Sequence, residues 1–259
     1  MTMKELTVVK IGGNVIDNPS ALDSALKQFA SIPDPKILVH GGGAIATELC
    51  TKLGIPIVMH EGRRITDVET LKVALMVYAG LTNKQIVAIL QKYACNAIGL
   101  SGADGDTIPA TRRNPEPIDY GCVGDVDPAK INAVMISSLL GRGMTPVFCA
   151  ITHDGNGNLL NTNADTMASC LAAGMSSLYC VKLVYCFEKA GVLENPDNED
   201  SVIPIMTHER FEELKKSGVV SKGMIPKLSN AFFAVDHGVQ EVEIKGCDDI
   251  AKGMGTIIK

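Results

Sequence analysis

Tryptophan is absent from the sequence, and other aromatic residues are few, with 6 Phe and 5 Tyr in 259 residues. None of the 8 cysteines forms a C-x-x-C pair, so we expect buried free thiols in a reducing compartment rather than disulfides. For Cys180 and Cys186 we expect no role beyond packing. The 5 histidines are dispersed without the spacing of metal ligands, so the sequence predicts no metal site.

A strong excess of one charge is also missing. Lys and Arg total 24 and Asp and Glu total 29, which gives a net charge of −5 and argues against nucleic acid or an anionic membrane as a partner. No apolar run approaches the roughly 20 residues of a membrane-spanning helix, and the N-terminal run ends too soon at glycine for a signal peptide. We therefore expect a soluble, cytoplasmic protein.

What the sequence does contain is aliphatic residues and glycine, with 46% hydrophobic residues and 25 glycines. Short apolar runs that end in glycine alternate with helical patterns, as in the βα units of a parallel sheet. Strands are expected at residues 6–11, 37–39, 97–100, 107–112, 145–150, 178–187, 240–245 and 256–258. Helices are expected at residues 19–29, 44–53, 67–79, 83–93, 128–140, 163–173, 209–216 and 224–237. The predicted fold is an α/β three-layer αβα sandwich with an open, mainly parallel sheet.

Two of these strands end in glycine loops. Lys10 precedes Gly12 and Gly13, and His40 precedes the three glycines 41–43. Ligands of open α/β sheets bind beyond the carboxyl ends of the strands, where glycines let backbone N–H groups approach phosphate oxygens. A plain turn with a lysine at a strand end accounts for the first loop equally well, so from this motif both interpretations stay open.

The second loop also fits a dinucleotide-binding pattern. Residues 41–46 read G-x-G-x-x-A, and Glu61 lies near the distance expected for the acid that binds the ribose. Two anion-binding loops at neighbouring strands suit a phosphate and a carboxylate better than one pyrophosphate. The pattern G-x-x-x-x-G-K-[ST] does not occur, which excludes a P-loop.

Two later segments carry polar residues beyond what local structure needs. In NTNAD, Asn163 suffices as a helix cap, yet Asn161 and Asp165 flank it. In KGMIPK, Lys227 falls in the first turn of a helix, where its charge opposes the helix dipole and a nearby anion would stabilise it. Both segments therefore suggest a binding site.

Seven segments, in this order and at these spacings, resemble the amino acid kinase family: VVKIGGN, VHGGG, GRRIT, GLSGADGD, GDV, NTNAD and KGMIPK. Within the family they are similar to the members that phosphorylate N-acetyl-L-glutamate. The resemblance covers residues 10–227 and, with the closing strands, essentially the whole chain. It implies the fold of amino-acid and carbamate kinases as one domain over residues 1–259. An N-terminal lobe of about residues 1–175 would bind the acylamino acid, and a C-terminal lobe of about residues 176–259 would bind the nucleotide.

The resemblance also implies roles for single residues. Lys10 and Lys227 match two catalytic lysines that neutralise the transferred phosphoryl group and contact the nucleotide, and Asp165 matches the carboxylate that holds them. The glycines expected to bind ATP phosphates are Gly12, Gly13 and Gly43. The residues expected to bind the acylamino acid are Gly42, Gly43, Arg64 and Asn161, with Arg64 on its α-carboxylate.

The implied reaction is phosphorylation of a γ-carboxylate by ATP, with Mg²⁺ carried by the nucleotide, as a step of arginine biosynthesis. A carboxylate is already ionised at neutral pH, so no general base is needed. Catalysis then consists of bringing two anions together in line and stabilising charge on the phosphoryl oxygens.

The segment after Leu178 departs from the family, because the Asp expected in the nucleotide site is missing and Glu188 is the substitute that we propose. The acyl group stays open between acetyl and succinyl. Arginine-inhibited relatives carry an additional N-terminal helix, whereas the first strand here begins at Leu6. We therefore expect a homodimer that free arginine does not inhibit.

Two other functions were weighed. A non-catalytic nucleotide or amino-acid sensor on the same fold would explain the altered segment 178–191, but it has no need of both Lys10 and Lys227. An NAD-dependent dehydrogenase would explain residues 41–46 and would leave NTNAD and KGMIPK without a role.

Overall fold

A computed structural model describes residues 3–60, 63–195, 197–220, 223–251 and 255–259, so Glu61 and Lys222 lie outside the described residues. An eight-stranded sheet runs through the molecule in the order β12-β14-β13-β11-β1-β2-β8-β5. All neighbouring strands are parallel except β13 and β14. The strands are β1 (Glu5–Ile11), β2 (Lys36–His40), β5 (Ala97–Leu100), β8 (Thr145–Cys149), β11 (Cys180–Phe187), β12 (Ile205–Met206), β13 (Glu241–Gly246) and β14 (Thr256–Ile258).

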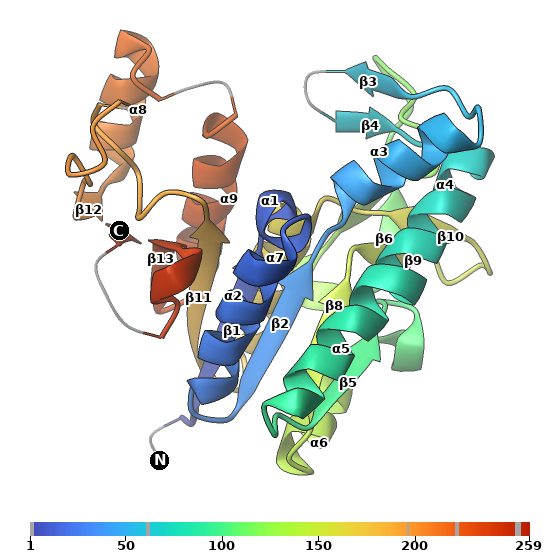
Figure 1. The fold of residues 1–259 in the computed structure, drawn as a ribbon, viewed down its shortest axis with the longest axis horizontal. Helices are drawn as coiled ribbons and strands as arrows, with labels where there is room; N and C mark the ends of the chain where they lie inside the picture. The colour runs from blue at the N-terminus through green and yellow to red at the C-terminus, as the bar shows by residue number, and fades with distance from the viewer. Residues whose placement is uncertain (1–2, 61–62, 196, 221–222, 252–254) are drawn as a thin grey trace.

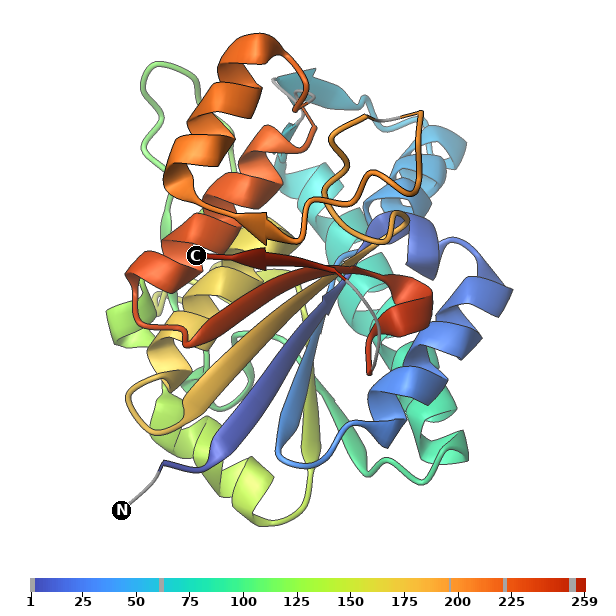
Figure 2. The ribbon, with the colours of Figure 1, turned by 90° about the vertical axis from the view of Figure 1, so that its left-hand side faces the viewer.

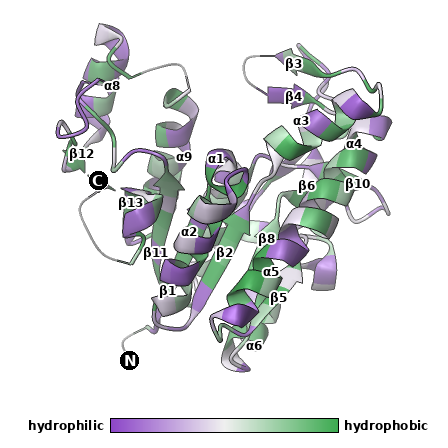
Figure 3. Cartoon of the chain, viewed as in Figure 1, coloured by the Kyte–Doolittle hydropathy of each residue, from purple (hydrophilic) through white to green (hydrophobic). Residues whose placement is uncertain are grey.

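Helices cover both faces of this sheet, which confirms the predicted αβα sandwich (Figure 2). Helices α2 and α5 lie on one face, and α6, α7 and α9 lie on the other. The α-helices are α1 (Gly13–Ile16), α2 (Pro19–Ser31), α3 (Gly43–Lys52), α4 (Val68–Leu75), α5 (Asn83–Lys92), α6 (Ala133–Gly141), α7 (Ala164–Met175), α8 (His208–Ser217) and α9 (Ile225–Asp236). Strands β2 and β11 are hydrophobic along most of their length, as buried parallel strands must be (Figure 3).

Successive side chains of β1 point to opposite faces of the sheet, and each face has its own core. Val9 and Ile11 pack with residues of α2 and α5. Leu6 and Val8 pack with residues of α7 and α9 on the other face. Lys10 has the same parity as Leu6 and Val8, so its side chain leaves the strand on the α7 side. This alternation determines which helix the lysine can reach.

The carboxyl ends of β1 and β11 form the point where the sheet changes direction. After β1 the chain continues toward β2 on one side, and after β11 it continues toward β13 on the other side (Figure 1). Connections that diverge in this way leave a crevice between the two strand ends, where open α/β sheets bind ligands. Lys10 and Phe187 lie at these two ends.

Three two-stranded hairpins accompany the sheet. They are β3 (Val58–His60) with β4 (Arg63–Ile65), β6 (Ala110–Arg112) with β7 (Gly124–Val126), and β9 (Ile151–His153) with β10 (Leu159–Asn161). Single β-bridges connect Thr66 with Gly121 and Val123 with Asn161, so the three hairpins are linked to one another. Strands β3, β4, β7 and β12 were not predicted, because strands of two or three residues carry no periodicity.

The predicted separation of helices 67–79 and 83–93 is wrong. Helix α4 passes into a π-helical segment, Met76–Thr82, and then directly into α5, so one helix runs for 25 residues from Val68 to Lys92. Gly80 does not break this helix, because it lies on the exposed side. This helix is long and apolar enough to cross a membrane, but 44% of its most apolar window is buried inside the protein.

The predicted helix at residues 128–140 is interrupted. A 3₁₀ turn at Pro128–Lys130 precedes α6, which begins only at Ala133. The side chain of Asn132 accepts a hydrogen bond from the backbone N–H of Met135 and so caps α6. Asn132 therefore starts a new helix where the apolar pattern alone suggested a continuous one.

Candidate active site

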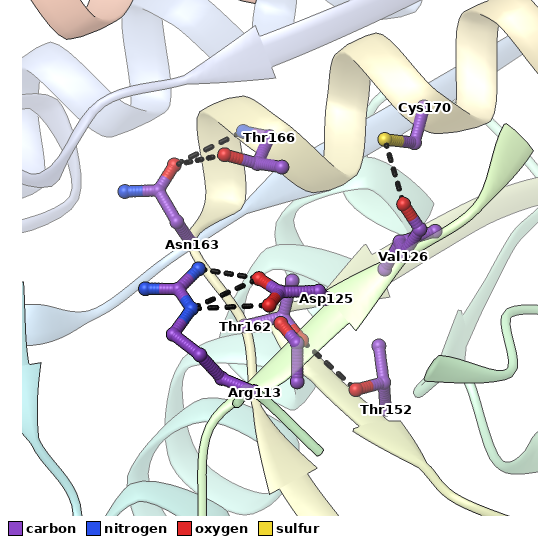
Figure 4. Close-up of polar contacts among 9 residues, drawn as sticks. Arg113, Asp125, Val126, Thr152, Thr162, Asn163, Thr166 and Cys170 are labelled. Carbon is purple, nitrogen blue, oxygen red and sulfur yellow. Dashed lines mark hydrogen bonds and ion pairs between the residues drawn. The ribbon is translucent and has the colours of Figure 1, made fainter. Parts of the chain in front are cut away.

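Lys10 and Asp165 form an ion pair at the centre of the molecule. Lys10 Nζ lies 2.6 Å from Asp165 Oδ1, and the two side chains are only 8% and 14% exposed. Asp165 lies in the first turn of α7, whose N-terminus is capped by Asn163 through the N–H groups of Asp165 and Thr166. Figure 4 shows the contacts between Asn163 and Thr166. The hydroxyl of buried Tyr185 donates to the backbone oxygen of Asp165 at 2.9 Å. The carboxylate is thus held by its helix cap and by the neighbouring strand.

Lys227 approaches the same place from the first turn of α9. Its Nζ lies 3.8 Å from the centre of the Phe187 ring, and Lys10 Nζ lies 5.5 Å from that centre. Burial lowers the pKa of Lys227 and nearby Lys10 lowers it further, while Asp165 opposes both effects. Within the described parts of the chain, Asp165 pairs directly with Lys10 alone and acts on Lys227 through space. Phe187 was missed in the sequence, although its place at the end of the strand beside β1 was the signal for it.

An apolar cleft of about 370 Å³ opens on one side of the lysines. Its floor contains Lys10, Lys227 and the loop of Gly12 and Gly13. Gly12 precedes α1 without a side-chain cap, so this loop presents backbone N–H groups. The apolar part of the wall consists of Val15, Phe187, Val192, Leu193, Val219, Val220 and Met224.

Glu188 lies at the edge of the apolar cleft, where it follows Phe187. Its carboxylate accepts a hydrogen bond from the side-chain amide of Asn14. The side chain is exposed and so is available to a ligand in this cleft. The predicted substitute for the missing Asp therefore does line the cleft.

A second cleft, of about 250 Å³, lies on the other side of the ion pair. We call it the arginine cleft, because Arg63, Arg64 and Arg113 line it together with the glycine loop 41–43 and Asn161. Lys10 and Gly13 line both clefts, so the two cavities meet at the lysine. One ligand in each cleft would have its reactive end beside Lys10.

Arg64 is oriented by the helix that follows the glycine loop. Its Nη2 donates to the Gly43 carbonyl at 3.1 Å and to Thr47 Oγ1 at 2.6 Å. Its Nη1 is buried and has no hydrogen-bond partner among the described residues. A buried guanidinium nitrogen without a partner is costly, and a ligand carboxylate would satisfy it.

The remaining predicted residues of this cleft contribute backbone and amide groups. Gly42 and Gly43 start α3, and no side chain caps its first turn, so the helix presents free N–H donors. The side-chain amide of Asn161 donates to Thr66 Oγ1 at 3.0 Å, which fixes it at the cleft wall.

Arg113 was not predicted as a site residue. Its Nε and Nη2 donate to both oxygens of Asp125, whereas Nη1 makes none of these bonds (Figure 4). The guanidinium also lies 5.3 Å from the centre of the Tyr120 ring, and Asp125 raises its pKa. An arginine on a β-hairpin gives no signal in the sequence, because only folding brings it to the cleft.

The chain was then compared with known proteins. The model of the amino acid kinase family matches residues 5–246. The chain belongs to the amino acid kinase family. This confirms the resemblance carried by the seven motifs, and with it the prediction of a phosphotransferase of the acetylglutamate kinase type.

Similar proteins span the full length of this amino acid kinase. It is 51% identical to an acetylglutamate kinase of Phocaeicola vulgatus over 99% of this chain and 100% of that protein. It is 54% identical to an acetylglutamate kinase of Cytophaga hutchinsonii over 93% of this chain and 91% of that protein. Its fold matches the crystal structure of smu.665 from Streptococcus mutans with a TM-score of 0.82, at 26% identity and 98% coverage of both chains.

Proposed function

We propose that this enzyme transfers the γ-phosphoryl group of ATP to the γ-carboxylate of an N-acyl-L-glutamate. The observation that carries the proposal is the meeting of an apolar cleft and an arginine cleft at Lys10. Lys10 is paired with Asp165, and the Nζ atoms of Lys10 and Lys227 lie 5.5 Å and 3.8 Å from the centre of the same Phe187 ring. Two cations at the junction of two clefts suit the joining of two anionic ligands.

ATP would occupy the apolar cleft. Its aliphatic wall suits a purine ring, and the N–H groups after Gly12 and Gly13 suit phosphate oxygens. Glu188, held by Asn14, would contact the adenosine end. We further propose that Mg²⁺ enters with the nucleotide and neutralises part of its phosphate charge.

The acylated amino acid would occupy the arginine cleft. The unpartnered Nη1 of Arg64 would bind its α-carboxylate, because it carries two N–H donors and the guanidinium stays charged at neutral pH. The N–H groups of Gly42 and Gly43 and the amide of Asn161 would bind the remaining polar atoms. This arrangement directs the γ-carboxylate toward Lys10.

In the reaction, an oxygen of the γ-carboxylate forms a bond to the γ-phosphorus as the bond from that phosphorus to the bridging oxygen of ADP breaks. No proton is transferred, because both the carboxylate and the leaving phosphate are ionised. Lys10 and Lys227 stabilise the charge that spreads over the phosphoryl oxygens, and Asp165 keeps Lys10 in place.

The acyl group is acetyl or succinyl. If Arg64 binds the α-carboxylate, the acyl group faces the wall that contains Arg63, Arg113 and Tyr120. The free Nη1 of Arg113 would then suit a carboxylate at the end of a succinyl group.

The experiment is a two-substrate assay with N-acetyl- and N-succinyl-L-glutamate. We expect ADP release with at least one of them, and trapping with hydroxylamine should give the hydroxamate of the acyl phosphate. Absence of hydroxamate with both substrates would contradict the kinase proposal. Binding of both ligands by calorimetry without turnover would favour the sensor instead.

We also place the reaction in the biosynthesis of arginine, in the cytoplasm, and propose a homodimer. The helix Val68–Lys92 supports the dimer, because Val68, Met76 and Leu81 expose 59%, 52% and 48% of their surface. The two lobes, about residues 1–175 and 176–259, would bind the acylamino acid and the nucleotide respectively. The single sheet that runs through both lobes would fix their relative position.

A further inference from the structure

A series of buried hydrogen bonds connects the long helix with the glycine loop of the arginine cleft. His40 is fully buried at the end of β2, and its Nδ1 lies 2.7 Å from the carbonyl oxygen of Gly41. Its Nε2 lies 3.0 Å from Nδ2 of Asn83, the first residue of α5. That Nδ2 lies 2.9 Å from the carbonyl oxygen of Val147. None of these groups acts in the proposed phosphoryl transfer.

The partners determine where each proton lies. A carbonyl oxygen only accepts hydrogen bonds, so the group of Asn83 beside Val147 is its NH₂. The same NH₂ donates to Nε2 of His40, which therefore carries no proton. The ring proton lies on Nδ1 and is donated to Gly41. Burial lowers the pKa of His40 to about 4, so the ring is neutral at physiological pH.

This proton placement turns the peptide that follows Gly41. In a trans peptide the C=O and N–H groups point in opposite directions. The imidazole of His40 binds the Gly41 carbonyl in the core, so the N–H of Gly42 must point away from the histidine. It then points toward the arginine cleft, which the loop lines. Gly42 has a φ of +156°, and a Cβ there would lie 2.9 Å from Cδ1 of Tyr78. The tyrosine thus packs directly on the loop.

The π-helical segment brings Tyr78 and Asn83 to the same side of the long helix. Each residue of an α-helix turns by about 100°, so two residues five apart would point about 140° apart. The i→i+5 hydrogen bonds of a π-helix bring such residues closer to one line. Tyr78, Thr82 and Asn83 are all buried here. Tyr78 contacts Gly42, and Asn83 contacts the histidine behind it.

We propose that Asn83 and the π-helical segment Met76–Thr82 hold the glycine loop 41–43 in position for the acylated amino acid. Asn83 contacts the loop through His40, and the segment contacts it through Tyr78. His40 and Asn83 are positioning residues, because they act through the loop, whereas Tyr78 also lines the arginine cleft itself. The inference rests on the proposed function in assigning the arginine cleft to the acylated amino acid. The placement of the proton on His40 is independent of that assignment.

The first experiment examines the wild-type protein without substrate. Long-range ¹H–¹⁵N spectra of histidine-labelled protein report which ring nitrogen carries the proton. We expect His40 to be protonated on Nδ1 and to show no titration between about pH 6 and 8. A proton on Nε2, or titration in this range, would overturn the inference whether or not the enzyme is a kinase.

The second experiment measures steady-state kinetics of Asn83→Asp and Asn83→Ala. We expect kcat/KM for the acylated amino acid to fall roughly 10- to 100-fold while KM for ATP stays unchanged, since all three glycines of the loop, Gly43 included, line the arginine cleft and not the apolar cleft. The matched control is Gln85→Ala, because Gln85 lies two residues after Asn83 in α5, outside the π-helical segment, and is exposed. It should retain wild-type kinetics.

A folded Asn83 variant with wild-type kcat/KM for both substrates would overturn the inference, as would equal losses for ATP and the acylated amino acid. If the wild-type enzyme phosphorylates neither acylglutamate, the kinase proposal fails and the histidine spectrum still decides the proton placement. If neither Asn83 variant folds, the histidine spectrum of the wild-type protein still decides where the proton on His40 lies.

Discussion

At the level of single residues, the site depends on how Asp165 is placed relative to Lys10 and Lys227. Asp165 lies 2.6 Å from Lys10 and only influences Lys227 through space. Lys227 is therefore the less neutralised of the two cations, and burial already lowers its pKa. An incoming phosphate would stabilise it more than it would stabilise Lys10. We expect Lys227 to contribute chiefly when the phosphoryl group carries its largest charge.

Lys227→Met should reduce kcat by about 10²–10³-fold with little change in KM for ATP, because it removes a charge that acts in the transition state. The measurement is initial-rate kinetics with saturating acylglutamate. Lys216→Met is the control, since Lys216 is an exposed lysine of α8. Equal effects of the two substitutions would contradict the role of Lys227.

The lowered pKa of Lys227 predicts an alkaline limit of activity. The side chain must be protonated to stabilise the phosphoryl oxygens, so kcat/KM for ATP should fall as the pH rises through its pKa. Burial and the charge of Lys10 lower this pKa, so the fall should begin at a lower pH than an ordinary lysine would give. In Lys227→Arg the limit should move to higher pH, because a guanidinium stays protonated. An unchanged profile would assign the limit to another group.

Arg113 provides a test of the acyl group. Arg113→Gln should lower kcat/KM for N-succinylglutamate by about tenfold or more and leave N-acetylglutamate nearly unchanged, since of the two acyl groups only succinyl ends in a carboxylate that could pair with Arg113. Arg112→Gln is the control, because Arg112 on the same hairpin pairs with Asp119 and does not line the cleft. Equal losses for both substrates would show that Arg113 only supports the hairpin.

At the level of secondary-structure elements, the first turn of α7 carries Asp165, the carboxylate that pairs with Lys10. Asn163 accepts hydrogen bonds from the N–H groups of Asp165 and Thr166, and Tyr185 binds the Asp165 carbonyl. The side chain of Asn163 was expected from the sequence as an ordinary helix cap, and it is one. Because the residue it caps is Asp165, the same hydrogen bonds also orient the carboxylate.

Asn163→Ala should lower the free energy of unfolding by about 1 kcal/mol and also reduce kcat, because the loss of the cap loosens the turn that holds Asp165. Asn132→Ala removes the equivalent cap of α6, outside both clefts, and should cost the same stability without loss of kcat. Thermal unfolding and initial rates measure the two quantities. If both variants kept full activity, the cap would have only a structural role.

The long helix shows where sequence patterns fail at this scale. Apolar periodicity predicts helices at residues 67–79 and 83–93, but it does not indicate that residues 76–82 are π-helical and join the two into one helix. A π-helix needs no special residue, and it persists here because Val77, Tyr78, Thr82 and Asn83 are all buried against the rest of the fold. Its cause is tertiary packing, so the local sequence does not encode it.

At the level of the whole molecule, the site exists because strands distant in sequence are neighbours in space. Residue 10 lies beside residue 185 in the sheet, and β1 is flanked by β2 on its other edge. The chain leaves β1 and β11 in opposite directions, which opens the crevice in which Lys10, Lys227 and Phe187 meet.

The proposed homodimer gives a prediction for the whole molecule. Val68→Glu should shift the protein from dimer to monomer in light scattering, because it places a charge at an apolar position of the long helix that is 59% exposed. An acidic residue is favourable in the first turn, so the helix itself should not suffer. Val134→Glu is the matched control, being 72% exposed in the first turn of α6. Dissociation by Val134→Glu alone would move the interface to α6.

By itself, the sequence determined the αβα class, the two glycine loops at strand ends and the residues that match the family motifs. These features are local, since each depends on a run of apolar residues or on a few adjacent side chains. Only the tertiary structure decided that Asp165 pairs with Lys10 rather than with both lysines, that the Phe187 ring lies beside both cations, and that Arg113 lines the arginine cleft. Those contacts join residues far apart in the chain, and their distances follow from sheet order and helix packing, which no local pattern contains.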